Sequence, residues 1–99
     1  MTNIDTPLDA IETLSALGMR VAVARKALRW RQQDLCDRAC ISRSTLVAIE
    51  KGSPNVSMDA WVRSLWALNA LADLEKILPL ETETQQLLAY HAPQRVRLK

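Results

Sequence analysis

The segment RQQDLCDRACISRSTLVAIEKG, residues 31–52, limits the possible folds of this chain more than any other part of it. Apolar residues recur at helical spacing in both halves of the segment, which predicts two short helices, at 32–39 and 43–50. Residues 40–41 form the turn between them, and the second helix presents an outward strip of small and basic side chains. The segment therefore predicts a pair of helices joined by a tight turn.

Capping residues mark the ends of the predicted helices. Ser42 can accept a hydrogen bond from a free backbone amide in the first turn of the helix at 43–50, and Gly52 follows the end of that helix. Ser57 caps a further helix, predicted at 58–68, in the same way. Asn69 can then adopt the left-handed conformation that ends it.

Helices are also predicted at both ends of this region. Residues 5–7, Asp-Thr-Pro, signal a helix start with a capping side chain ahead of the proline, and helical spacing continues to about Arg29. Gly18 indicates either a break after a short leading helix or a close contact with another helix. A fifth helix is predicted at 71–78, and only residues 95–98 alternate in a way that could pair as an edge strand. We therefore expect an all-α fold of five helices.

The charge of the chain is unevenly distributed. Residues 1–19 carry three acids and no base, a net charge of −3. Residues 20–51 carry eight bases against three acids, a net charge of +5, and residues 52–99 balance at five against five. The positive region suits contact with a polyanion, although many soluble helical proteins show fluctuations of this size.

Several classes of protein are disfavoured by the sequence. No apolar run approaches the roughly 20 residues that span a bilayer, and the acidic N-terminus does not resemble a signal peptide, so we expect a cytosolic protein without a membrane partner. Cys36, Cys40 and the single His91 are a poor zinc set, and Cys36 is expected in the core. No catalytic constellation is recognisable, so we expect no enzyme, metal or cofactor.

The predicted helix at 43–50 has the chemistry of a DNA-reading helix. Leu46 and Ile49 are three positions apart and face inward. The opposite face presents Arg43, Ser44, Val47 and Ala48 near the helix N-terminus. Only the first turns of such a helix reach base edges in a major groove about 12 Å wide. Arg43 can donate two hydrogen bonds to guanine, Ser44 can bond a base or a phosphate, and the two apolar side chains can contact a thymine methyl group.

The chain resembles the lambda-repressor-like, or XRE-type, helix-turn-helix family over residues 17–71. The resemblance rests on Gln32, Leu35, Ala39, Ile41, Ser42, Thr45, Leu46, Ile49, Glu50 and Gly52. It implies a five-helix DNA-binding domain, which we place at residues 15–78. Residues 1–14 are then an N-terminal extension or leading helix, and residues 79–99 are a short C-terminal extension and basic tail.

The same resemblance implies roles for individual residues. It implies a largely buried ion pair between Arg25 and Glu50, and base contacts from Arg43, Ser44 and Ala48. Phosphate contacts are implied for Gln32, which opens the second predicted helix, and for Ser42. The basic residues Arg31 and Lys51 complete the phosphate contacts that we expect.

Two positions depart from the family pattern. The family usually has glycine where Cys40 stands, so this side chain must tolerate an unusual backbone angle or change the turn. Val47 and Ala48 replace polar side chains that are often found there, which leaves Arg43 as the chief hydrogen-bonding reader. DNA shape can then contribute to selectivity.

Residues 55–58, Asn-Val-Ser-Met, and residues 64–68, Ser-Leu-Trp-Ala-Leu, are similar to the HipB-like branch of this family. Members of that branch are antitoxins, encoded beside HipA-type kinase toxins, that repress their own promoter and bind the toxin. The resemblance implies that role in the bacterial cytoplasm, at the nucleoid. The alternatives are a stand-alone XRE-type regulator and a protein-binding module without a DNA function.

Apolar residues occupy two faces of the predicted helix at 58–68. One stripe holds Trp61, Leu65 and Leu68, and the other holds Val62, Trp66 and Asn69. A helix that is apolar on both sides is buried twice or forms an interface. We expect a homodimer through Val62, Trp66 and Leu71, with its recognition helices on palindromic half-sites about 34 Å apart. The alternative is that the fifth helix covers the second stripe.

Overall fold

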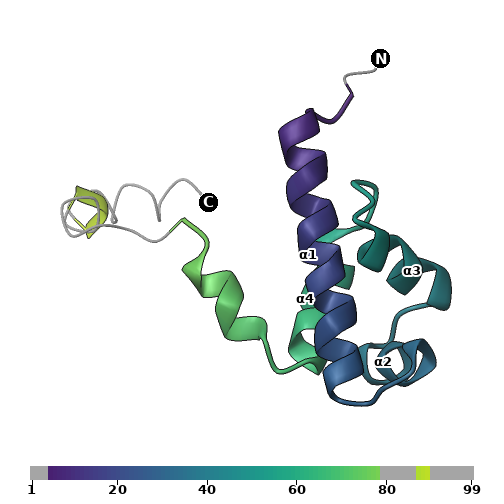
Figure 1. Ribbon diagram of the computed structural model, residues 1–99. Coiled ribbons are helices and arrows are strands. Elements are labelled where there is room, and N and C mark those ends of the chain that lie inside the picture. Colours follow the sequence, from purple (N-terminus) through teal and green to yellow (C-terminus); the bar gives the residue numbers. More distant parts are fainter. Residues whose placement is uncertain (1–4, 79–86, 90–99) are drawn as a thin grey trace.

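The computed structural model of the chain describes residues 5–78 and 87–89 (Figure 1). Its elements are the α-helices α1 (Leu8–Ala27), α2 (Gln32–Ala39), α3 (Arg43–Lys51) and α4 (Met58–Ala67) and the 3₁₀ helix η1 (Leu71–Lys76). A single helical turn follows at 87–89. The predicted all-α class is confirmed. Apart from that turn, the expected C-terminal extension and basic tail at 79–99, with His91 and the alternating residues 95–98, lies outside the described residues.

Helix α1 is one continuous helix that stands upright in Figure 1, with α2 and α3 on one side of it and η1 on the other. Its N-cap position is Pro7, which makes no side-chain capping hydrogen bond, so the expected capping side chain ahead of the proline is wrong. In the described part of the chain, no helix combines the length and the hydropathy needed to cross a membrane.

Gly18 lies where α1 crosses α3. A Cβ atom at this position would overlap the carbonyl oxygen of Ile49 and lie 2.9 Å from that of Glu50. Gly18 is therefore a contact residue that allows two helix backbones to approach closely. Of the two expectations for this glycine, the close contact is correct and the helix break is wrong.

The turn between α2 and α3 contains a non-glycine residue in the left-handed conformation. Cys40 has φ 58° and ψ 49°, so the backbone keeps the geometry of a glycine turn and accepts a side chain there. The caps at the two ends of α3 are as predicted. The Ser42 hydroxyl accepts a hydrogen bond from the Thr45 backbone amide at 3.1 Å, and Gly52 ends α3 at φ 78°. The predicted bounds of α2 are confirmed, and α3 runs one residue further than predicted.

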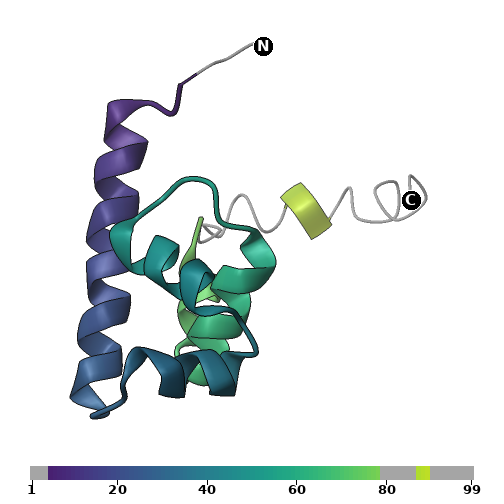
Figure 2. The same cartoon turned by 90° about the vertical axis from the view of Figure 1, so that its right-hand side faces the viewer.

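The core lies between the four α-helices, whose arrangement Figure 2 shows. Its buried apolar residues are Val21, Leu35, Cys36, Ala39, Leu46, Ile49, Ala60 and Trp61. Helix α1 packs mainly on α3, and α2 packs mainly on α4, so every helix contributes a face. Trp30 packs against this core at the end of α1, and the Arg38 guanidinium carbon lies 4.2 Å from its ring centroid. That cation–π contact holds α2 against the turn before it.

The region after α4 differs from the prediction. Helix α4 ends at Ala67 and Asn69 follows in the left-handed conformation at φ 61°, as expected, but the fifth helix is the 3₁₀ helix η1. None of its six residues is buried. So short a segment gains too little from packing to be held as a regular α-helix. It leaves the side chain of Trp66 62% exposed, so the alternative in which the fifth helix covers the second stripe is wrong.

Candidate nucleic-acid interface

An ion pair between α1 and α3 holds the inner side of the interface. The Arg25 Nε donates to Glu50 Oε2 at 2.7 Å and a terminal guanidinium nitrogen donates to Glu50 Oε1 at 3.2 Å. Both side chains are only 9% exposed. The other terminal nitrogen of Arg25 donates to the Trp30 carbonyl at 2.8 Å, which ties the end of α1 to the same site. This is the pair that the family resemblance implies, and it fixes α3 against α1.

A hydrogen-bonded chain runs from this pair to the surface. The Gln32 side-chain amide donates to Glu50 Oε1 at 3.1 Å, and Arg43 donates to the Gln32 side-chain oxygen at 3.3 Å. Gln32, the first residue of α2, is thus hydrogen-bonded to residues near both ends of α3. Sequence reasoning placed Gln32 on a phosphate and did not foresee that it also orients Arg43, because α2 and α3 must pack together before these atoms meet.

The outer face of α3 carries the residues assigned to bases. Arg43 and Ser44 are exposed, whereas Val47 and Ala48 are half-buried. Leu46 and Ile49 on the inner face are completely buried, which holds the helix rigidly. The fold therefore brings together the four residues assigned to bases and presents them outward, with Arg43 on the flank nearest α2.

The residues assigned to phosphates lie at the start of α2 and at both ends of α3. Arg31 has an 83% exposed side chain, which donates to Asp34 at 3.1 Å, and this bond lowers the pKa of Asp34. The ionised carboxylate also accepts from the Arg31 backbone amide at 2.7 Å and closes the first turn of α2. Lys51 is exposed at the end of α3, and Ser42 is exposed while its hydroxyl caps the helix.

The two cysteines have different surroundings. Cys36 is buried, and this burial raises the pKa of its thiol, so it is an unreactive core side chain as expected. Cys40 is exposed at the rim of a hollow beside α3.

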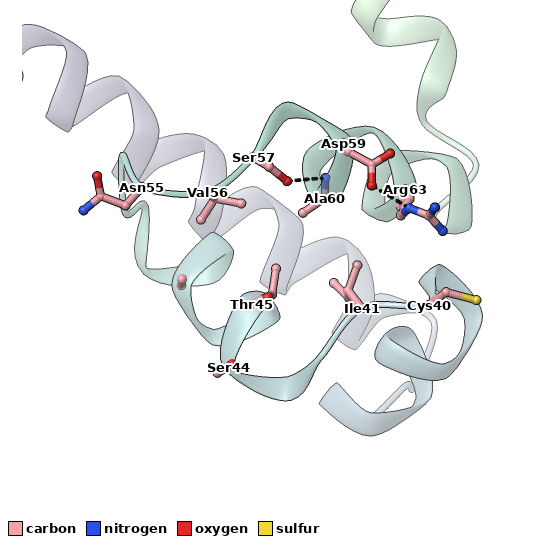
Figure 3. A pocket seen from close by; sticks show the side chains of 11 residues that line it. Cys40, Ile41, Ser44, Thr45, Asn55, Val56, Ser57, Asp59, Ala60 and Arg63 are labelled. Atoms are coloured by element: carbon pink, nitrogen blue, oxygen red, sulfur yellow. Dashed lines mark hydrogen bonds and ion pairs between the residues drawn. The ribbon is translucent and has the colours of Figure 1, made fainter.

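This hollow, of 470 Å³, lies between α3 and α4 and was not foreseen from the sequence (Figure 3). Its walls include Ser44 and Ala48 from α3 and Asp59 and Arg63 from α4. Arg63 donates to Asp59 at 2.8 Å, and both side chains are exposed, that of Arg63 by about half. The i,i+4 spacing of an acid and a base was visible in the sequence, but its position beside the outer face of α3 depends on the packing of α4.

Comparison with known proteins assigns the chain to a family. A family model described as a helix-turn-helix domain matches residues 16–76, more than half of the chain. The chain belongs to this helix-turn-helix family. Its two defining helices are α2 and α3, and domains of this kind place the second of them in the DNA major groove. No curated protein and no solved structure matched the chain.

The helix-turn-helix assignment makes Arg43 the first residue to test. Replacing Arg43 with alanine should weaken specific binding by about 1–3 kcal/mol and relax selectivity at one base position, because the variant lacks the guanidinium that we expect to donate two hydrogen bonds to a guanine. The Arg43→Lys variant keeps the charge and loses the bidentate geometry, so it should relax the same position with a smaller loss of affinity. Selection from a randomised operator measures both effects. An unchanged base preference in the alanine variant would rule out Arg43 as a reader.

Proposed function

We propose that the protein is a dimeric transcriptional repressor that reads a palindromic operator through α3. The observation that carries this proposal is the capped, rigidly packed helix α3, whose outer face begins with the exposed Arg43, held by its hydrogen bond to Gln32. The reader is then Arg43, with Ser44, Val47 and Ala48 beside it. Lys51, Ser42, Gln32 and Arg31 would contact the phosphates and fix the register on the duplex.

The salt dependence of binding tests this proposal. About eight phosphate contacts per dimer imply that log affinity falls with log salt at a slope near −7. Titration of the protein's own promoter fragment at several salt concentrations measures that slope. A protein that retards neither this fragment nor any duplex selected from a random pool would instead be a protein-binding module.

The dimer in this proposal forms through the outward stripe of α4. Val62 is half-buried, Trp66 is 62% exposed and Leu71 is 37% exposed, so an apolar surface remains on α4 and η1. Two-fold dimers are the commonest soluble oligomers, and a second copy would cover this surface with its own. The dimer would also set the two α3 helices one turn of DNA apart.

Replacing Trp66 with glutamate should give monomers at micromolar concentration, because the new carboxylate would be buried without a partner at the centre of the interface. Sedimentation velocity measures the change. The matched control is Val23→Glu on α1, where a 59% exposed apolar side chain is replaced outside the proposed interface. A Trp66→Glu variant that sediments as a dimer would place the interface elsewhere.

We further propose that the repressor belongs to the HipB-like branch and acts as an antitoxin in the bacterial cytoplasm, without catalytic activity or a cofactor. The similarity of residues 55–58 and 64–68 to that branch supports this role. Residues 55–58 lead into the start of α4, and residues 64–68 cover the last residues of this helix and its C-cap. The test is co-expression with the product of an adjacent kinase-like reading frame, followed by size-exclusion chromatography. The lack of such a frame, or of a complex, would favour a stand-alone regulator.

A further inference from the structure

The outer face of α3 has two different flanks. On one flank α2 begins, and there Arg43 bonds to Gln32. On the other flank lies the 470 Å³ hollow, whose lining includes Ser44 and Ala48 (Figure 3 shows the hollow). A residue pair assigned to base contacts thus forms one wall of the hollow, so the hollow opens beside the surface that meets the base edges.

The dimensions of the major groove determine what this hollow would face. A helix with its side chains is about 10–12 Å across, and the groove between the two sugar–phosphate strands is about 12 Å wide. A helix in the groove therefore has one strand close to each flank. If the α2 flank of α3 takes one strand, the hollow on the other flank faces the opposite strand.

The charged groups of the hollow come from α4. Arg63 is the cation among its lining residues, and Asp59 is the anion. Arg63 Nε lies 2.8 Å from Asp59 Oδ2, with the side chains 48% and 73% exposed. An exposed pair of this kind contributes little to stability, because water solvates both charges well. Arg63 can therefore exchange its carboxylate partner for another anion at small cost.

We propose that the hollow is a second phosphate site, in which Arg63 leaves Asp59 and binds a phosphodiester of the strand opposite to the one held at α2. Asp59 then lowers the affinity for DNA, since it competes for Arg63 and repels the incoming phosphate. The inference rests on the proposed DNA binding through α3. It adds to that proposal a contact from α4, and a carboxylate whose removal strengthens binding.

Two variants test the site, Arg63→Ala and Asp59→Asn. The chain offers a matched control pair on η1, where Lys76 Nζ lies 3.6 Å from Asp73 Oδ1 and both side chains are exposed. Lys76→Ala and Asp73→Asn change the net charge by the same amounts away from α3. Affinities are measured at several salt concentrations for a duplex selected with the wild-type protein and for an unrelated duplex. Thermal unfolding verifies that each variant is folded.

For each bound chain, Arg63→Ala should reduce the magnitude of the salt slope by about 0.9 and weaken binding about five- to ten-fold at 0.1 M salt, because one phosphate contact is lost. Both duplexes should be affected by the same factor, and base preference should not change. Asp59→Asn should bind both duplexes more tightly. The two η1 variants should show neither effect.

An Arg63→Ala variant that binds like Lys76→Ala would overturn the phosphate site while leaving the proposed repressor intact. An Asp59→Asn variant that binds no more tightly than wild type would overturn the competition between Asp59 and phosphate. Wild-type protein that binds neither duplex would overturn the proposed function itself, and the two failures are therefore distinguishable.

Discussion

Replacing Glu50 with alanine should lower the free energy of unfolding by about 3–5 kcal/mol, because the change leaves the buried Arg25 guanidinium without its charged partner. Arg25 would retain only its bond to the Trp30 carbonyl. The variant should also bind DNA more weakly, since Gln32 loses the carboxylate that holds it in place for Arg43. Chemical denaturation followed by circular dichroism measures the stability, and titration of the operator measures the binding.

An exposed acid provides the control for this prediction. Asp73→Ala removes the same charge from a surface ion pair and should change the stability by less than about 1 kcal/mol. The double variant Arg25→Met, Glu50→Met should recover part of the lost stability, because apolar side chains can replace a buried ion pair without leaving a charge. If Glu50→Ala unfolded at the same denaturant concentration as Asp73→Ala, the pair would not hold α1 to α3.

The substitution Gly18→Ala should destabilise the domain by about 1–3 kcal/mol although alanine is the better helix former. The new methyl group would overlap the carbonyl oxygen of Ile49, so α1 and α3 would have to separate. Because the two backbones meet at this point, no side-chain rotation can relieve the contact. The midpoint of thermal unfolding, compared with that of the wild type, measures the effect.

Helix propensity alone predicts the opposite sign at this position. The matched control is Thr13→Ala, an exposed position in the same helix, where alanine should stabilise by up to about 0.7 kcal/mol. If the Gly18→Ala variant were more stable than the wild type, the free-energy cost of separating α1 and α3 would be smaller than the gain in helix propensity.

The parts of the fold that were predictable from the sequence depend on local interactions. The start of α3 follows from Ser42, whose hydroxyl reaches an amide three residues away, and its end follows from Gly52. The inner face of α3 follows from the spacing of Leu46 and Ile49. Caps and periodicity act over one or two turns of helix, so a short stretch of sequence contains the information that they need.

Interactions between distant segments were predictable only in part. The family resemblance implied the pair of Arg25 and Glu50, but nothing local indicated that Gln32 would link this pair to Arg43. The hollow beside α3 requires the placement of α4 against α3, which sequence spacing does not give. The geometry of η1 was missed because the propensity of its residues favours an α-helix, while its lack of burial leaves that preference without support.

The separation of the two faces of α3 has a consequence for protein engineering. Leu46 and Ile49 anchor the helix from the inside, while Ser44 and Val47 have no hydrogen bond to the Arg25–Glu50 site. Libraries that vary Ser44 and Val47 on an unaltered scaffold should therefore yield folded proteins with new target sequences. Arg43 is different, because it shares a hydrogen bond with Gln32, and a successful change of one should require a compensating change of the other.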